Sequence, residues 1–313
     1  MTESREKSEM TNCCVLVDDG NLCGEAPIWD ARATKLYWVD CLSSKLFAFD
    51  WNTKERAVVL ENFEINGLAL NEPGGFVLSN NTGVWLWRGT GDPLLIAAQV
   101  GNVKLQLNDC IADSHGRLLT GTCFYAPFET FPLGHLVSVG TDGSAQILDD
   151  GFHLANGLCF SPDSKILYFA DSVERTIYAY SYDSRRGTVS NKAVFVKVDS
   201  NAGLPDGLTV DSDGFVWSAE WYGGCVKRYD PDGKLERRIV IPAKQISSLA
   251  FGGPDLTEMF ITSAAKSEPM PVMPPGYDAL SGYFGGALFR INVDIRGRLE
   301  HKANISIGAE VRG

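Results

Sequence analysis

The sequence lacks the local motifs of several large enzyme classes. It has no HExxH, no GxSxG, no P-loop and no dinucleotide-binding fingerprint, so no short motif points to the chemistry that these patterns carry. Histidine is also scarce, with four residues in 313. No pattern locates a Ser-His-Asp triad. A functional site must therefore be sought among residues that lie far apart in the chain.

Long apolar runs and clusters of positive charge are missing as well. No apolar run approaches the length of a membrane span, and 28 Lys and Arg stand against 39 Asp and Glu, for a net charge of −11. Because phosphate binding needs clustered Lys and Arg, we expect neither nucleic acid nor a membrane as partner. Residues 1–12, MTESREKSEMTN, have no apolar core. They predict a flexible tail, no secretory signal and a cytoplasmic protein.

The cysteines also lack a recognisable spacing. Eight are scattered along the chain, and none forms a CxxC pair. A disulfide framework belongs to small secreted domains, whereas dispersed cysteines in a chain of this length indicate reduced thiols.

The most informative feature of the chain is a short sequence repeat. Each copy has a leading polar residue, an apolar strand, a turn and a second strand, and the leading residues are 41, 42, 48, 50 and 42 positions apart. That period is typical of propeller blades, and the alternation of apolar and polar residues around each turn indicates antiparallel hairpins. The six copies are GEAPIWDARATKLYWVD from Gly24, INGLALNEPGGFVLS from Ile65, LNDCIADSHGRLLTG from Leu107, ANGLCFSPDSKILYFAD from Ala155, PDGLTVDSDGFVWSAE from Pro205 and ISSLAFGGPDLTEMFIT from Ile246.

The repeat predicts an all-β protein, a six-bladed β-propeller that forms a single domain over 13–313. A blade buries its apolar faces only against its neighbours, so the six sheets must close into a ring. The segment CCVLVDDG at 13–20 has no hairpin partner of its own. We expect it to pair with GALFRINVD at 286–294, so that the N- and C-terminal strands close one blade.

The leading polar residues are the candidate site. The innermost strand of each blade lines the central channel, and residues at the same phase should therefore meet at one mouth. On this argument Glu25, Asn108, Asn156 and Asp206 become neighbours. Carboxylate and amide oxygens suit a hard divalent cation. The alternative is that these Asn and Asp residues only cap turns, as Asn-Gly and Asp-Gly often do.

Several short motifs between about Gly24 and Arg296 occur together in this chain: GEAPIWD, LYWVD, ND followed by DxxGR, ANGLCFSPD, LYFADS, PDGLTVDSDG and RYDPDG. In these motifs the chain resembles the SMP-30/gluconolactonase family, which includes regucalcin and sugar lactonases.

The resemblance implies one divalent metal ion in the central channel, held by Glu25, Asn156 and Asp206. It also implies that Asn108 lies beside the metal and contacts substrate or a metal-bound water. Ca²⁺, Mg²⁺, Mn²⁺ and Zn²⁺ all remain candidates for the ion.

Two positions depart from the family pattern. Many sugar lactonases of the family have an arginine where this chain has Gln106, and an amide lacks the charge and the fixed fork of a guanidinium. The common GTM is here GTCFY, which places Tyr125 after Gly121. We predict that Gln106 and Tyr125 contact the substrate, and that the departures affect which lactone is bound more than the metal site.

The predicted function is metal-dependent hydrolysis of a small lactone, most readily a sugar aldonolactone, to the hydroxy acid, with Asp206 as general base. Two alternatives stay open: a regucalcin-like calcium-binding regulatory protein without catalysis, and a hydrolase of another ester. Two insertions, at 123–135 and 266–286, are lid candidates. Glu220 is expected at an exposed strand edge, and Trp38 in the core.

Overall fold

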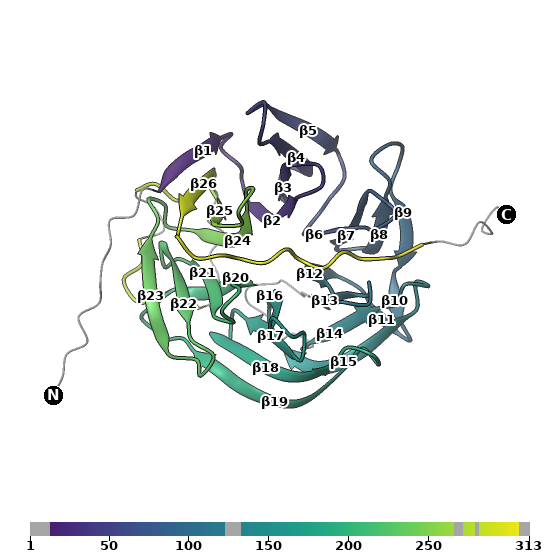
Figure 1. The fold of residues 1–313 in the computed structure, drawn as a ribbon. Helices are drawn as coiled ribbons and strands as arrows, with labels where there is room; N and C mark the ends of the chain where they lie inside the picture. The colour runs from purple at the N-terminus through teal and green to yellow at the C-terminus, as the bar shows by residue number, and fades with distance from the viewer. Residues whose placement is uncertain (1–12, 123–132, 266–271, 279–281, 307–313) are drawn as a thin grey trace.

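Six four-stranded antiparallel sheets stand around a central axis (Figure 1). The computed structural model describes residues 13–122, 133–265, 272–278 and 282–306. The described residues form strands and turns without a helix, and thus none that could span a membrane. The all-β, six-bladed prediction is confirmed. Residues 1–12, for which a flexible tail is predicted, and most of the insertion at 123–135 lie outside the described residues.

The strands follow the chain from the inside of each blade to the outside. In the first three complete blades they are β2 (Gly24–Asp30), β3 (Lys35–Asp40), β4 (Lys45–Asp50) and β5 (Arg56–Glu61); β6 (Gly67–Leu70), β7 (Phe76–Asn80), β8 (Gly83–Trp87) and β9 (Leu94–Ala97); and β12 (Leu107–Ala112), β13 (Leu118–Thr122), β14 (Gly134–Val139) and β15 (Ala145–Phe152). A two-stranded ribbon, β10 (Gln99–Val100) and β11 (Val103–Lys104), stands between the second and third blades.

The next two blades repeat this order, and the last one differs. The fourth and fifth are β16 (Ala155–Phe160), β17 (Ile166–Asp171), β18 (Thr176–Asp183) and β19 (Thr188–Lys197), then β20 (Leu204–Val210), β21 (Val216–Trp221), β22 (Cys225–Tyr229) and β23 (Leu235–Val240). The sixth has β24 (Ile246–Gly252), β25 (Glu258–Ser263), β26 (Ala287–Asn292) and β1 (Cys14–Asp18).

The sixth blade closes the ring with both ends of the chain. β1 forms its outer strand and pairs antiparallel with β26, with Val15 opposite Phe289 and Asp18 opposite Ala287. This confirms the predicted closure. It holds the ring shut, because the first and last sheets cannot separate without breaking that ladder.

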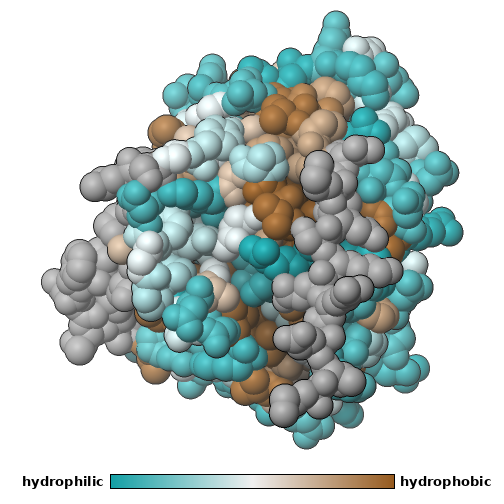
Figure 2. All heavy atoms as spheres, turned by 90° about the vertical axis from the view of Figure 1, so that its left-hand side faces the viewer, coloured by the Kyte–Doolittle hydropathy of each residue, from teal (hydrophilic) through white to brown (hydrophobic). Residues whose placement is uncertain are grey.

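The hydrophobic core is divided among the six interfaces between blades. Each interface has its own cluster of buried side chains. Trp38 is fully buried and stacks on Phe47 between the sixth and first blades, as expected. On the side of the ring seen in Figure 2, hydrophilic residues cover most of the surface, with apolar residues in smaller groups. The seven cysteines within the described residues are free thiols, in agreement with the prediction.

After β26 the chain turns back and crosses the ring (Figure 1). We call residues 295–306 the C-terminal strap. It passes over the turns at the ends of the inner strands, from the fifth blade through the fourth and third to the second. Its hydrogen bonds include Ser212 N to Arg296 O (2.9 Å), Arg298 Nη1 to Ser161 O (3.2 Å), Asn304 N to Gly116 O (2.8 Å) and Ala303 N to Leu70 O (2.8 Å).

Candidate functional site

The inner strands break their register where the leading polar residues stand. Five of the six have a shift in pairing at that point. A bulge of this kind re-aims a side chain that the regular alternation of a strand would send elsewhere. The shifts fall between Glu25 and Ile28, Leu107 and Cys110, Asn156 and Leu158, Pro205 and Leu208, and Ile246 and Leu249.

The glycine that follows the polar residue lets neighbouring blades approach closely. A Cβ built on Gly157 would lie 2.2 Å from the backbone oxygen of Asp206, and one on Gly67 would lie 2.8 Å from the nitrogen of Cys110. Neither glycine has a positive φ, so they serve contact between blades and not a tight turn. The turn-capping alternative is wrong for Asn156 and Asp206, which lie inside β16 and β20.

Hydrogen bonds between blades join the tops of the inner strands. The side-chain Nδ2 of Asn66 donates to Leu107 O (2.8 Å), and that of Asn108 donates to Ala155 O (2.9 Å). In each case the acceptor is the carbonyl just before the leading polar residue of the next blade. Ser247 likewise donates from the sixth blade to Gly24 O. Residues at the same position of each sequence repeat thus lie at the same level along the channel.

The predicted convergence of the two asparagines is direct. Asn108 Nδ2 donates to Asn156 Oδ1 over 2.8 Å, although 48 residues separate them. Both N–H groups of Asn108 are therefore committed, one to Asn156 and one to Ala155 O. Its side-chain oxygen is the only part left to meet a ligand, and an amide oxygen only accepts hydrogen bonds.

Glu25 and Asp206 share a poorly solvated space. Burial raises the pKa of Glu25 well above its usual value, and repulsion from the Asp206 carboxylate raises it further. Burial likewise raises the pKa of Asp206, followed by repulsion from Asp109. Asp206 is 3% exposed. The two carboxylates, 181 positions apart in the sequence, have come within electrostatic reach, as predicted.

The residues fit a hard cation. Within the described residues, no Lys or Arg forms an ion pair with Glu25 or Asp206, and two poorly solvated carboxylates without a counter-charge are costly. The described part of the chain has no group of three or more His, Cys, Asp and Glu placed to hold a metal ion. An ion here would therefore depend on the amide oxygen of Asn156 beside the two carboxylates.

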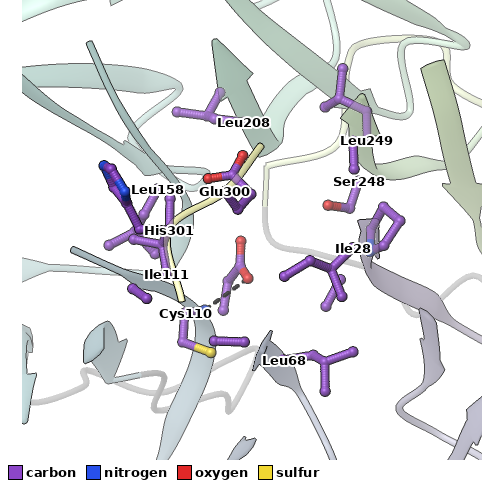
Figure 3. A pocket seen from close by; sticks show the side chains of 16 residues that line it. Ile28, Leu68, Cys110, Ile111, Leu158, Leu208, Ser248, Leu249, Glu300 and His301 are labelled. Carbon is purple, nitrogen blue, oxygen red and sulfur yellow. Dashed lines mark hydrogen bonds between the residues drawn. The ribbon is translucent and has the colours of Figure 1, made fainter. Parts of the chain in front are cut away.

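Further down the channel lies a second acidic region that the sequence did not reveal. A cavity of about 40 Å³, with room for about three waters, is lined by Asp109 and Glu300 among apolar side chains such as Leu158 and Leu249. Glu300 comes from the C-terminal strap (Figure 3). Burial raises the pKa of Asp109 to about 6 and that of Glu300 to about 7. Glu300 lies outside the six repeats, so its position in the repeat could not be used to predict that it lies in the channel.

Other predicted residues have mixed outcomes. Gln106 is half-buried and directly precedes β12, and its contact with substrate stays a prediction. Tyr125 lies outside the described residues. Glu220 was expected at an exposed edge, and this is wrong: it is fully buried, and its carboxylate accepts from Lys227 Nζ (2.9 Å) and Ser218 Oγ (3.0 Å). The wide burial of β21 between two blades explains the difference.

The second insertion is partly described and covers the loop after β21. Tyr277 packs on Tyr222 with ring centroids 4.4 Å apart, and Val272 O accepts a hydrogen bond from Arg175. Trp221 and Tyr222 are thereby buried against this segment. Packing of this kind supports the placement of 272–278 over the ring, and the role as a lid stays a prediction.

Comparison with known proteins shows the family of the chain. The sequence model of the family described as SMP-30/Gluconolactonase/LRE-like region matches residues 23–265. The chain belongs to this family. All four leading residues, Glu25, Asn108, Asn156 and Asp206, lie within the matched region. The match ends before β26, so the closing ladder and the C-terminal strap lie beyond it.

Relatives within the SMP-30/gluconolactonase family include sugar lactonases and regucalcins. The pentonolactonase of Haloferax volcanii is 35% identical over 293 residues, which covers 94% of this chain and 98% of that protein. Regucalcin of Xenopus laevis is 33% identical over 250 residues, or 77% of this chain and 83% of regucalcin. A solved structure of a calcium-binding protein, regucalcin, from Agrobacterium tumefaciens has a TM-score of 0.81 at 26% identity and covers 93% of this chain and 97% of that one.

Proposed function

We propose that this protein hydrolyses a small lactone, most readily a sugar aldonolactone, to the open hydroxy acid with the help of one divalent cation. The relation to a pentonolactonase supports the reaction class. The observation that carries the proposal is that Glu25 and Asp206 repel each other in one poorly solvated channel, at the phase of the repeat that Asn156 shares.

Glu25, Asn156 and Asp206 would hold the cation through their side-chain oxygens. A divalent cation in such a place supplies Lewis-acid polarisation of a carbonyl and lowers the pKa of water. Within the described residues, no basic side chain pairs with the two carboxylates, so the net charge of the ligand set is −2 when both are ionised. That charge matches a doubly charged ion.

Asp206 is the general base. Its carboxylate accepts the proton of the attacking water as the water oxygen bonds to the lactone carbonyl carbon. The ring C–O bond then breaks, and the proton passes to the departing ring oxygen, which becomes a hydroxyl. Such proton transfer typically contributes about 10²- to 10⁴-fold to the rate. Because Asp206 is almost fully buried, its position is fixed before substrate arrives.

Asn108 orients the substrate by accepting a hydrogen bond. Its two N–H groups are occupied by Asn156 Oδ1 and Ala155 O, so its oxygen is directed to a donor. A sugar hydroxyl is such a donor, and a lactone carbonyl is not. This division of roles favours polyhydroxylated lactones over simple ones.

The test is acid release, followed with a pH indicator, from a panel of γ- and δ-aldonolactones and aryl esters. Metal-stripped protein is assayed with Ca²⁺, Mg²⁺, Mn²⁺ or Zn²⁺ restored. We expect cation-dependent turnover of aldonolactones that falls at least about 100-fold in Asp206→Asn. Turnover near the wild-type level in that variant contradicts the assignment of the base, and preference for aryl esters favours the hydrolase of another ester.

A second candidate function is calcium binding without catalysis. The likeness to a structure named as a calcium-binding protein favours it, and the same oxygen ligands would serve. The same experiment separates the two: calcium bound tightly by a protein that turns over no lactone on the panel favours the binding protein.

A further inference from the structure

We propose that Ser172 is the positioning residue that turns the side-chain oxygen of Asn156 toward the channel. The inference rests on the proposed function, because it assigns Asn156 as a cation ligand. Ser172 follows β17 in the turn that leads to β18, and it is 1% exposed. It lies 16 positions after Asn156 and in the same blade.

Three asparagines at the same phase of consecutive repeats behave differently. Asn66 and Asn108 each use Nδ2 to donate to the carbonyl that precedes the next blade's leading residue. The corresponding acceptor for Asn156 is Pro205 O. That oxygen accepts instead from Ser172 Oγ over 2.6 Å. Ser172 has therefore taken over the contact between blades that an asparagine makes elsewhere.

The hydroxyl of Ser172 determines which way the Asn156 amide faces. A backbone carbonyl only accepts, so the single O–H of Ser172 must point to Pro205 O. The lone pairs of the same oxygen then need a donor, and Asn156 Nδ2 provides it over 3.0 Å. With its nitrogen held there, Asn156 must present Oδ1 on the opposite side.

The oxygen of Asn156 keeps one free lone pair. Asn108 Nδ2 donates to Asn156 Oδ1, and the orientation of Asn108 is itself fixed by Ala155 O. An amide oxygen has two lone pairs. One is taken by Asn108, and the second is left for the cation that Asn156 would hold together with Glu25 and Asp206.

The backbone holds Ser172 in place independently of its side chain. Ser172 N donates to Leu154 O (3.1 Å), directly before β16. The carboxylate of Asp171 accepts from His153 N (2.8 Å) and Leu154 N (3.2 Å). Removal of the Ser172 hydroxyl should therefore leave the turn intact and free only the amide of Asn156.

The test is the direct titration of Ca²⁺ and Mn²⁺ into the metal-stripped full-length protein by calorimetry. Partners of metal ligands typically contribute about 10- to 100-fold to affinity. We expect Ser172→Ala to weaken cation binding at least about tenfold and Ser172→Thr, which keeps the hydroxyl, to restore most of it. Should Ser172→Ala fail to fold, Ser172→Cys, which has a similar size and a weaker donor, should weaken binding in the same direction.

Ser79→Ala is the matched control. Ser79 is fully buried and donates to Asn108 O over 2.6 Å between the second and third blades, and among the described residues it has no hydrogen bond with a side-chain amide. Its loss should lower the melting temperature comparably and leave cation affinity unchanged. Equal weakening by both alanine variants, or an unchanged affinity in Ser172→Ala, overturns the inference. A wild-type protein that binds neither cation overturns the proposed function, and the inference falls with it.

Discussion

At the scale of single residues, the site is dominated by two carboxylates that repel each other, the half-buried Glu25 and the buried Asp206. Glu25 and Asp206 both have raised pKa values because of burial, and the repulsion from Asp206 adds to the shift of Glu25. A space of this kind is unfavourable when empty and favourable when it holds a cation. Stability and ligand binding are therefore opposed at the same two side chains.

Glu25→Gln tests this opposition. The variant removes one charge from the pair, so the metal-free protein should melt about 2–4 °C higher at pH 8 than the metal-free wild type. Added Ca²⁺ or Mn²⁺ should stabilise the variant less than the wild type. The measurement is thermal unfolding with chelator and with cation. A variant that gains as much from cation as the wild type contradicts the role of Glu25.

Glu300, which is not one of the proposed cation ligands, makes the stability of the fold depend on pH. Burial raises its pKa to about 7, with a smaller contribution from Asp109, whereas Thr209 and Arg298 act to lower it. The unfolded chain has the ordinary glutamate value, so the folded state binds more protons between pH 4.5 and pH 7. Stability is consequently lost as the pH rises through this range and is lowest above it.

Glu300→Gln should remove that loss. We expect the unfolding free energy of the variant, relative to that of the wild type, to rise by about 2 kcal/mol when the pH is raised from 5 to 8. Urea unfolding of both proteins at the two pH values measures the difference. A difference in unfolding free energy that does not change with pH would mean that Glu300 ionises freely in the fold.

The site residues divide sharply into those that the sequence could predict and those that it could not. Glu25, Asn108, Asn156 and Asp206 share one phase of a visible repeat, so a closed ring had to bring them together. Glu300 has no such phase. Ser172 is the last residue of the segment LYFADS, but its importance depends on the carbonyl of Pro205, which belongs to the next blade.

At the scale of the elements, the inner strands work as a set because small residues let them touch. Gly157 lies in β16 against the backbone of β20, and a Cβ there would be 2.2 Å from Asp206 O and 2.5 Å from Leu208 N. Both are backbone atoms of the strand that carries the general base. A shift of that strand would move Asp206 itself.

Gly157→Ala should therefore damage both stability and activity. Overpacking typically costs about 1–3 kcal/mol, and a displacement of about 1 Å at the site can cost about 100-fold in rate. Urea unfolding and lactone turnover measure the two effects. Wild-type turnover in a folded Gly157→Ala protein would show that the contact between β16 and β20 does not set the position of Asp206.

The strand order was readable from the sequence, but the bulges were not. The alternation of apolar and polar residues gave the hairpins, since each half-buried strand has a period of two. The register shifts at Asn156 and Asp206 depend on packing against the neighbouring blade. This is why the turn-capping alternative looked reasonable for an Asn-Gly pair that lies inside a strand.

At the scale of the whole molecule, the ring depends on the ladder between β1 and β26. Deletion of residues 1–18 removes the outer strand of the sixth blade and leaves β26 as an unpaired edge. We expect a lower melting temperature and aggregation, because an exposed strand edge invites pairing with other chains. Deletion of residues 1–12, which leaves every described residue in place, is the control and should melt like the full chain. Equal melting of both deletions contradicts the closure role.

The C-terminal strap also affects how small molecules reach the central channel. It crosses the channel at the ends of the inner strands, while Asn156 stands near the beginning of β16. Within the described residues, the strap therefore lies across one end of the channel, and the leading polar residues lie toward the other. If the proposed function holds, the lactone and the acid formed from it would both pass through that other end, so that accumulated product would compete with incoming substrate.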